Sequence, residues 1–364
     1  MNILITNFHP KIGGGHLTYV KYLFFELPKL GHNVYVASPM GSKLANDINE
    51  FYPDNLYFVD FPGKIKELFL MIKNIFLVSR IIKEKNIEIV HVNGSPDHKI
   101  VSLARFFFKL SFKIIRTKHD SHKIKWNFFN KILYKKFTDR MIVVSNYQLK
   151  EVVPKTLRNK VKVIENGIDL TRYSPREKSK ALLQKYNIGP KDLVFVSIAG
   201  SGIHKGWSLM LKALANNPML SCKIVIAGGT PTKSILESEV PKQIRNKVFF
   251  TSFLDDVRDV VGIADVGFVL SQSVETISYA CREMMAMAKP VIVSDYGGLP
   301  ENITPNYDGW VVDPNNTAIL SELISSLTKE LIKVFSENAL RKATKNFALK
   351  DSIIKTNNIY IGLE

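Results

Sequence analysis

The sequence predicts an α/β protein of two domains, each built on a parallel sheet. Its 364 residues exceed one ordinary domain, and 46% of them are apolar, which is enough to fill two cores. Short apolar runs of strand length alternate with longer amphipathic segments in both halves of the chain. Between 264 and 293 an apolar run, a helical segment and a second apolar run follow one another with short polar joints, as is typical of a parallel crossover unit.

The composition limits which cellular compartment and which binding partners we expect for the protein. Cys222 and Cys281 lie in apolar segments, so we expect buried, reduced thiols rather than a disulfide. We expect no signal peptide, no transmembrane helix and no metal site, because no segment has the required length or ligand spacing. These features favour the cytosol. The net charge of +17 predicts a polyanionic neighbour, which could be nucleic acid, anionic lipid or a phosphorylated substrate.

The first half of the chain alternates strands and helices. We expect strands at 2–6, 34–37, 87–92, 113–117, 141–145 and 161–164. Helices are expected at 17–30, 62–85 and 99–112. Gly31 provides a helix C-cap signal. The order predicts a parallel sheet with crossover helices.

A glycine-rich loop follows the first strand. It spans 7–16 and includes Gly14 and Gly15, directly before a helix. A strand, a glycine-rich loop and a helix form a shape that handles nucleotides. Consecutive glycines without the GxGxxG spacing are a weak signal, however, and a flexible turn fits them equally well.

His119 and Asp120 follow the 113–117 strand at its carboxyl end. A lone histidine in a basic loop is more often a surface residue. In open parallel sheets, however, ligands bind at the carboxyl ends of the strands. That position favours a site role for His119.

The segment from Lys99 to Arg140 is strongly basic. Its 42 residues hold twelve lysines and arginines against two acids, and aromatic residues are interleaved with the basic ones. Basic, aromatic-rich amphipathic helices bind anionic membranes. The same mixture could bind single-stranded nucleic acid, or the aromatics could belong to the core with only the lysines solvated. We favour the membrane surface over nucleic acid as the partner.

A polar, lysine-rich segment at 170–191 predicts an interdomain linker. Beyond it, strands are expected at 193–198, 223–229, 248–253, 264–270, 291–293 and 309–312. Helices are expected at 207–215, 277–287, 317–348 and 351–361. The pattern again predicts a parallel sheet with crossover helices.

Two stretches of the second half carry candidate chemistry. The loop 199–206 joins a buried strand to a helix and contains Gly202 and Lys205, whose ammonium could reach phosphate oxygens. Glu275 precedes the expected helix, and Glu283 lies eight positions later on a similar face. The helix N-terminus between them would offer backbone N–H groups to an anion. From spacing alone, a capping acid, a solvated glutamate and a solvated lysine remain open.

The stretch 271–303 resembles the donor-site signature of the family 4 glycosyltransferases, which are retaining enzymes of the GT-B fold. That pattern is Glu, seven residues, Glu, then Ala-x-Gly-x-Pro-Val-Ile, then Asp-x-Gly-Gly-x-x-Glu. The matching positions are Glu275, Glu283, Ala286, Pro290, Val291, Ile292, Asp295, Gly297, Gly298 and Glu301. Thr276 and Ser278 replace two usual glycines, and Ala288 replaces a third.

The resemblance extends over nearly the whole chain. It implies a GT-B fold, with two Rossmann-like domains facing each other across a cleft. Residues 1–170 would form the acceptor-side domain and 171–348 the nucleotide-sugar domain, with a helix at about 349–364 crossing back to the first domain.

The resemblance also implies roles for single residues. Lys205 would hold the donor phosphates, Glu283 the ribose, and Glu275 the donor sugar, while His119 would line the reacting centre. Further donor contacts would come from Gly14, Gly15, Gly202, Thr276, Ile277, Ser278 and Arg282. No cofactor or metal is implied, and the donor would be a UDP- or GDP-sugar.

One departure affects the leaving group. The family usually places an arginine five or six residues before the lysine, whereas this chain has Ala199 and Gly200 there. Such an arginine stabilises the charge that develops on the leaving diphosphate. Either His204 or Arg282 replaces it, or the leaving group differs, for example a nucleoside monophosphate, or activity has been lost.

The sequence therefore predicts a retaining glycosyltransferase that acts on a glycan or lipid-linked glycan in envelope polysaccharide or lipopolysaccharide-type synthesis, bound peripherally to the inner membrane face. Two alternatives remain. A nucleotide-sugar epimerase can have a similar two-domain fold. A non-enzymatic membrane or nucleic-acid binding protein could keep the transferase fold after losing the activity.

Overall fold

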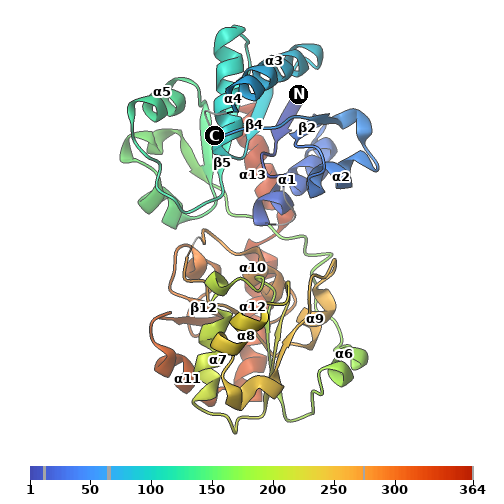
Figure 1. The fold of residues 1–364 in the computed structure, drawn as a ribbon, viewed down its shortest axis with the longest axis vertical. Helices are drawn as coiled ribbons and strands as arrows, with labels where there is room; N and C mark the ends of the chain where they lie inside the picture. Colours follow the sequence, from blue (N-terminus) through green and yellow to red (C-terminus); the bar gives the residue numbers. More distant parts are fainter. Residues whose placement is uncertain (11–13, 64–66, 274, 363–364) are drawn as a thin grey trace. The chain divides into compact units, whose positions relative to one another are not determined.

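The computed structural model describes residues 1–10, 14–63, 67–273 and 275–362. These form two compact units (Figure 1). The first unit comprises Met1–Asn166 together with the chain from Leu349 onward, and the second comprises Gly167–Ala348. Each unit is a parallel sheet with helices, so the predicted α/β class is confirmed.

The first unit has a seven-stranded parallel sheet in the order β3-β2-β1-β4-β5-β6-β7. The register places Leu4 opposite both Tyr35 and Val90. Its strands are β1 (Asn2–Thr6), β2 (Asn33–Ser38), β3 (Leu56–Phe58), β4 (Ile89–Val92), β5 (Lys113–Lys118), β6 (Arg140–Val143) and β7 (Val161–Val163). The sequence prediction omitted β3, an edge strand of only three residues.

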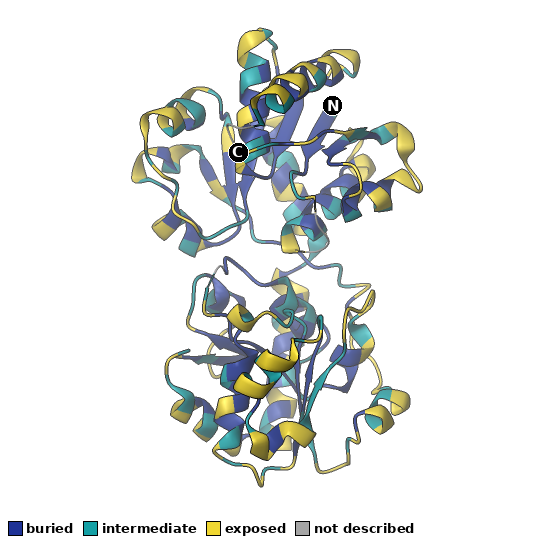
Figure 2. Cartoon of the chain, in the orientation of Figure 1, coloured by how far each residue is buried: buried dark blue, intermediate teal, exposed yellow. Residues whose placement is uncertain are grey.

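Alternate residues of this sheet face two different helix layers. Ile3 and Ile5 pack with helices α1, α2 and α13, whereas Leu4 packs with α3 and α4. The helices of this unit are α1 (Gly15–Glu26), α2 (Lys43–Asn49), α3 (Leu68–Glu84), α4 (Ser95–Phe107), α5 (Phe128–Lys136) and α13 (Leu349–Ile361). Figure 2 shows the buried strands between the more exposed helices.

Short 3-10 and π turns complete the first unit: η1 (Leu27–Leu30), η2 (Pro53–Asn55), η4 (Gln148–Val152) and η5 (Lys155–Lys160). The predicted helix 17–30 divides into α1 and η1, because Pro28 has no N–H to continue the α-helical ladder. Gly31 ends the segment with a left-handed φ of 82°, as its C-cap signal predicted. Of the predicted helix 62–85, residues 64–66 lie outside the described residues.

The second unit has a six-stranded parallel sheet in the order β10-β9-β8-β11-β12-β13. Its strands are β8 (Leu193–Ser197), β9 (Cys222–Ile226), β10 (Val248–Phe250), β11 (Val266–Val269), β12 (Val291–Ser294) and β13 (Gly309–Val312). All six match strands predicted from the sequence, with shorter bounds for most of them. The buried run of β8 is apolar on both faces, as expected for a strand covered on both sides.

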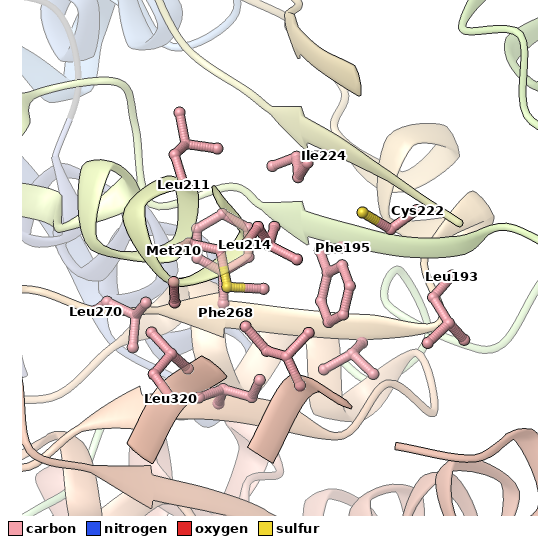
Figure 3. Close-up of a cluster of buried hydrophobic side chains, with 14 of the residues drawn as sticks. Leu193, Phe195, Met210, Leu211, Leu214, Cys222, Ile224, Phe268, Leu270 and Leu320 are labelled. Atoms are coloured by element: carbon pink, nitrogen blue, oxygen red, sulfur yellow. The ribbon is translucent and has the colours of Figure 1, made fainter. Parts of the chain in front are cut away.

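Helices cover both faces of this sheet. They are α6 (Lys180–Lys185), α7 (Trp207–Ala215), α8 (Lys233–Glu239), α9 (Arg258–Ile263), α10 (Tyr279–Ala286), α11 (Thr317–Ser326) and α12 (Lys329–Asn346), with 3-10 turns η6 (Ile203–Lys205), η7 (Lys242–Lys247) and η8 (Leu299–Asn302). Figure 3 shows the core on one face, where Phe195 and Phe268 of the sheet pack with Met210 and Leu214 of α7.

Two predictions about this unit have clear outcomes. Cys222 and Cys281 are free and buried, which confirms the expected thiols. The segment 170–191, predicted as a linker, is instead folded onto the second unit, because Tyr173 and Tyr186 are buried in its apolar clusters. The many lysines of this segment made its sequence look like a polar linker, although the two tyrosines are buried.

Candidate functional site

The topology of the second unit defines where its site lies. Strands β8 and β11 are neighbours in the sheet, but the chain continues from them toward opposite edges. This is the switch point at which open α/β sheets bind ligands, outside the carboxyl ends of the strands. Two loops meet there, one from β8 to Lys205 and the other from β11 to Ser278.

Lys205 and Glu275 form an ion pair across this switch point. The Lys205 Nζ lies 3.0 Å from Glu275 Oε2. The Ser271 hydroxyl donates to the same carboxylate oxygen, also at 3.0 Å. Ser271 is fixed in turn, since its carbonyl accepts a hydrogen bond from the Ser294 hydroxyl at 2.6 Å. The structure therefore joins two residues that the sequence places 70 positions apart.

Backbone contacts hold the two loops together. The Gln272 N–H donates to the His204 carbonyl at 3.1 Å. Gly206 follows Lys205 with φ +74°, and a Cβ at this position would lie 1.7 Å from the Leu270 carbonyl oxygen. Gly297 has φ +61°, and a Cβ added there would lie 2.2 Å from the Glu275 carbonyl oxygen. Glycine is thus required on both sides of the ion pair.

Helix α10 begins four residues after Glu275. Ser278 is its N-cap, and its hydroxyl accepts a hydrogen bond from the Cys281 N–H at 3.2 Å. The side chains of Thr276, Ile277 and Ser278 are all buried. A ligand at this helix start would therefore meet backbone groups rather than these three side chains.

Glu283 lies in the second turn of α10, within the same unit. The Tyr173 hydroxyl donates a hydrogen bond to its carboxyl group. Burial raises the pKa of Glu283 to about 7, and the hydrogen bond from Tyr173 and the charge of Arg172 only partly oppose this shift. A carboxyl group that titrates near neutrality can ionise on ligand binding and accept hydrogen bonds from ligand hydroxyls, so it is suited to a binding site.

Arg282 does not occupy the position predicted for it. Its side chain is fully buried, its Nε donates to Asn302 Oδ1 at 2.8 Å, and its guanidinium lies 4.3 Å from the centre of the Phe347 ring. Adjacent helix positions diverge by about 100°, so Arg282 points into the core beside α12. These contacts give no support to the prediction that Arg282 contacts the donor, which stays a prediction.

His204 is the remaining candidate near the lysine. It is exposed in η6, and a Cβ added to Gly202 would meet its ring, so a larger residue there would require the His204 side chain to move. Desolvation and the neighbouring Lys205 charge lower the pKa of His204. At neutral pH His204 can therefore donate a hydrogen bond, but it does not replace an arginine charge.

The first unit has its own switch point, between β1 and β4. His119 follows β5 at this sheet edge, and its Nε2 lies 2.9 Å from Asn93 Oδ1. The Tyr19 ring packs edge-on against His119 with centroids 4.9 Å apart, and the His16 ring lies 6.0 Å away. Burial lowers the pKa of His119 well below its ordinary value, so the imidazole is neutral.

A second group of polar side chains supports this edge. His91 Nε2 lies 2.7 Å from the Thr117 hydroxyl, which also contacts the Tyr19 hydroxyl at 3.0 Å. Burial lowers the pKa of His91 and of His16 to about 3. These neutral rings form a rigid hydrogen-bonding support around His119.

Gly14 and Gly15 open helix α1 at the same edge. Gly14 is the N-cap with φ +121°, a conformation that favours glycine. Both glycines are exposed, and among the described residues no side chain caps the helix. The Leu17 N–H donates to the Gly14 carbonyl at 3.0 Å, so the N–H groups before it are the ones that could bind an anion. The neighbouring Gly13 lies outside the described residues.

Sequence reasoning missed Ser271, Tyr173, Tyr19 and Asn93. Asn93 is the first residue after β4 and Ser271 the second after β11, and this position at the carboxyl ends of strands could have identified them. The two tyrosines have no such signal. In the described part of the chain, no group of three histidine, cysteine or acidic residues could hold a metal ion.

Family models match both halves of the chain. A model described as Glycosyltransferase Family 4 matches residues 13–172, and one described as Glycosyl transferases group 1 matches residues 178–347.

Similar proteins agree with these matches. An Escherichia coli UDP-Gal:alpha-D-GlcNAc-diphosphoundecaprenol alpha-1,3-galactosyltransferase is 22% identical over 80% of this chain and 79% of its own length. The N-acetyl-alpha-D-glucosaminyl L-malate synthase of Bacillus anthracis is 23% identical over 97% of this chain and 94% of its own. A solved glycosyltransferase from Rickettsia africae matches with a TM-score of 0.84 at 23% identity, over 99% of this chain and 97% of that one.

Proposed function

The chain belongs to the family 4 glycosyltransferases of GT-B fold, and from this premise we propose that it transfers a sugar from a nucleoside-diphosphate sugar to a glycan or lipid-linked glycan with retention of configuration. The observation that carries the proposal is the Lys205–Glu275 pair at the switch point of the second unit. In this proposal the second unit binds the donor and the first unit the acceptor.

Lys205 is proposed to stabilise the leaving diphosphate. Negative charge develops on the leaving oxygen as the sugar departs, and a fixed ammonium lowers the energy of that state. Lys205 pairs with Glu275 in the structure. Because the Ser271 hydroxyl also donates to that carboxylate, Glu275 keeps a partner when Lys205 moves to the phosphates. The backbone N–H groups at the start of α10 are proposed to supply further donors.

The remaining residues have separate proposed roles. Glu283 binds the ribose hydroxyls, Glu275 and the backbone of Thr276–Ser278 contact the sugar, and the neutral His119 lines the reacting centre. Gly14 and Gly15 bring backbone N–H groups toward the phosphates. Lysine and helix N-termini supply the charge stabilisation, so the proposal requires no metal.

The donor is proposed to be a UDP-sugar, with a GDP-sugar as the second choice. The Escherichia coli relative is named for UDP-Gal and for a lipid diphosphate acceptor, while the Bacillus anthracis relative makes an L-malate glycoside. Related chains thus use very different acceptors. The basic surface of the first unit favours the lipid-linked choice, in envelope-glycan assembly at the inner membrane face. In the described part of the chain, none of the helices combines the length and the hydropathy of a membrane span.

Nucleotide binding tests the donor proposal directly. We would measure thermal stabilisation by UDP, GDP, ADP and CMP and by their sugar conjugates. A ligand at 100 times its Kd stabilises the folded state by about 2.7 kcal/mol. Selective stabilisation by UDP or GDP supports the proposal, whereas selective CMP binding would mean a monophosphate leaving group and explain the missing arginine.

If no nucleotide stabilised the protein, the transferase proposal would be contradicted. A binding protein that keeps the transferase fold but has lost the activity would then be favoured. The comparisons give no support to that alternative or to an epimerase. Lys205→Met should lose most of the nucleotide shift, because the phosphates lose their cation. Lys212→Met is the matched control, since Lys212 lies on α7 and pairs with Glu239 at the surface.

A further inference from the structure

A large groove in the first unit has no role in the donor site. It has a volume of about 750 Å³ and lies among α3, α4 and α5, within the range of small-molecule sites of about 300–1,000 Å³. Its apolar lining consists of Met71, Leu103, Phe106, Phe129, Ile132, Leu133 and Phe137. Lys99, Lys125 and Lys136 also line it. The groove is therefore an apolar surface interrupted by cationic groups.

The groove continues into a smaller basic pocket. The two share Lys99, Lys125, Asn130 and Leu133, and the pocket has a volume of about 290 Å³. This pocket lies where β5 ends and α4 begins, since Lys118 and Ser95 both line it.

Charge in the small pocket favours an anion. Four lysines line it (Lys99, Lys118, Lys123 and Lys125) against one carboxylate, Asp120. Asp120 is paired with Lys118 at 2.7 Å. Among the described residues, the other three lysines have no ion-pair partner. Three uncompensated ammonium groups around one small hollow are suited to a phosphate.

The wall of the small pocket also contains an unused polar atom. His98 is fully buried, and its Nε2 lies 2.9 Å from the Thr138 hydroxyl. Its Nδ1 has no hydrogen-bond partner among the described residues. A buried nitrogen without a partner is costly in a folded protein, but this atom is shielded from solvent, so a ligand would reach it only after the pocket wall had shifted.

The aromatic side chains of α4 and α5 are exposed to an unusual degree. Phe106 is 59% exposed and Phe129 79% exposed, and both line the groove. Phe107 and Phe128 beside them are also exposed. Phe112 and Tyr134 from the same basic segment are buried, so part of that segment is core. Exposed apolar surface of this kind marks a binding site.

We propose that the groove and the small pocket together bind one phosphate-bearing lipid, with its phosphate among the lysines and its hydrocarbon chain along the phenylalanines. The proposal rests on the proposed function, because this lipid would be the carrier of the glycan acceptor. Lys118 and Asp120 line the pocket and flank His119 in the sequence. The head group is thus held at the strand end that carries the residue proposed for the reacting centre.

Farnesyl phosphate is a suitable monomeric probe. We would measure its binding to the full chain by titration calorimetry and compare it with farnesol and with inorganic phosphate. Each partial probe fills one half of the site, so each should bind at least about tenfold more weakly than farnesyl phosphate. Equal affinity of farnesol and farnesyl phosphate would remove the phosphate pocket from the proposal, and failure of farnesyl phosphate to bind would overturn the proposal as a whole.

Four single variants locate the site. Phe129→Ser and Lys125→Glu should each weaken farnesyl phosphate binding about tenfold or more. Phe69→Ser and Lys131→Glu are the matched controls, because Phe69 is 91% exposed and neither residue lines the groove or the pocket. Equal losses in all four variants would contradict a defined site. Displacement of farnesyl phosphate by a single-stranded oligonucleotide would assign the surface to nucleic acid instead.

Failure of this inference and failure of the proposed function are distinguishable. Sugar-nucleotide binding and transfer without farnesyl phosphate binding would overturn only the lipid site. Farnesyl phosphate binding in a protein that no nucleotide stabilises would leave the lipid site and overturn the transferase proposal. The nucleotide shifts of all four variants should equal that of the parent chain, since none of the four residues is proposed to contact the donor.

Discussion

At the scale of single residues, the proposed donor site contains an ion pair between Lys205 and Glu275. The Lys205 side chain is 25% exposed and that of Glu275 is 10% exposed, so their pair is partly shielded from water. Such a pair stabilises the loops modestly and can still be opened by a ligand. The proposed function accordingly uses an exchange of partners at this pair rather than a permanent contact.

Replacing Glu275 tests that exchange. Glu275→Gln should lower the transfer rate about 10²–10³-fold, as expected when one aligned polar group is lost from a reacting centre. The amide can still accept from Ser271, so we expect a loss of unfolding free energy within about 2 kcal/mol. Rates and thermal midpoints would be compared with those of Glu337→Gln, an exposed site on α12. An unchanged rate would remove Glu275 from the site.

Glu283 should give the protein a pH dependence. Its pKa is about 7 in the folded chain against an ordinary value of 4.5, so the folded state holds a proton that the unfolded state releases between these values. The contribution of Glu283 to stability should therefore fall as pH rises from about 5 to 8, so the parent chain should lose stability relative to Glu283→Gln over this range. Thermal midpoints of both proteins across this range would test the sign.

Nucleotide affinity should rise with pH, whereas the contribution of Glu283 to stability falls. The ionised carboxylate accepts ribose hydroxyls more strongly than the acid, and hydrogen bonds to charged groups contribute about 1.5–3 kcal/mol. UDP affinity of the parent chain should rise through pH 7, with a component that Glu283→Gln lacks. Parallel pH profiles of the two proteins would show that Glu283 does not bind the ribose in its ionised form.

At the scale of elements, glycines determine how closely the loops of the second unit approach one another. Gly206 and Gly297 allow η6 and the loop after β12 to approach the backbone beside Glu275. Ala288 shows the opposite case. It stands where the family pattern has glycine, and it adopts φ +59° all the same, a conformation that costs an L-residue about 1–2 kcal/mol.

Comparison of Gly206→Ala with Gly41→Ala should separate the cost of a steric clash from the cost of backbone strain. Gly41 has the same φ of +74°, but an added Cβ there meets nothing within 4 Å. Gly41→Ala should cost about 1 kcal/mol of unfolding free energy, and Gly206→Ala about 1–3 kcal/mol more, because the Leu270 carbonyl must move. Chemical denaturation would measure both. Equal costs would mean that the two loops are not held in contact.

At the scale of the whole molecule, the excess of positive charge is concentrated in the first unit. Residues 99–140 account for +10 of the net +17, from twelve basic and two acidic residues. The exposed phenylalanines of α4 and α5 belong to the same segment. Charge attracts the protein to an anionic bilayer, and apolar side chains then hold it there.

Vesicle binding should follow from this distribution. The protein should co-sediment with anionic vesicles at low salt and release at high salt, since each lysine near the surface contributes about 1 kcal/mol that salt screens. Lys131→Glu with Lys135→Glu on α5 should weaken binding more than Lys233→Glu with Lys242→Glu in the second unit. Both pairs change the net charge by −4, from +17 to +13. Equal effects would indicate that overall charge alone drives binding, and no co-sedimentation at low salt would overturn the membrane proposal.

The sequence by itself determined the α/β class, most strand positions and the family. These features are local. A buried strand is recognised from consecutive apolar residues, and the signature of the donor site lies within the single stretch 271–303. Glu275, Glu283 and Lys205 are therefore recognisable as candidates from residue type and spacing alone.

Only the tertiary structure decided which side chains meet. The Lys205–Glu275 pair arises because β11 lies beside β8 after the chain has first passed through β9 and β10. Arg282 and Glu283 are neighbours in sequence, yet one is buried on Phe347 and the other contacts Tyr173. The groove of the first unit likewise combines residues from α3, α4 and α5. Periodicity reports which face of an element is apolar, whereas contacts between elements depend on strand order and helix packing, which are long-range properties of the folded chain.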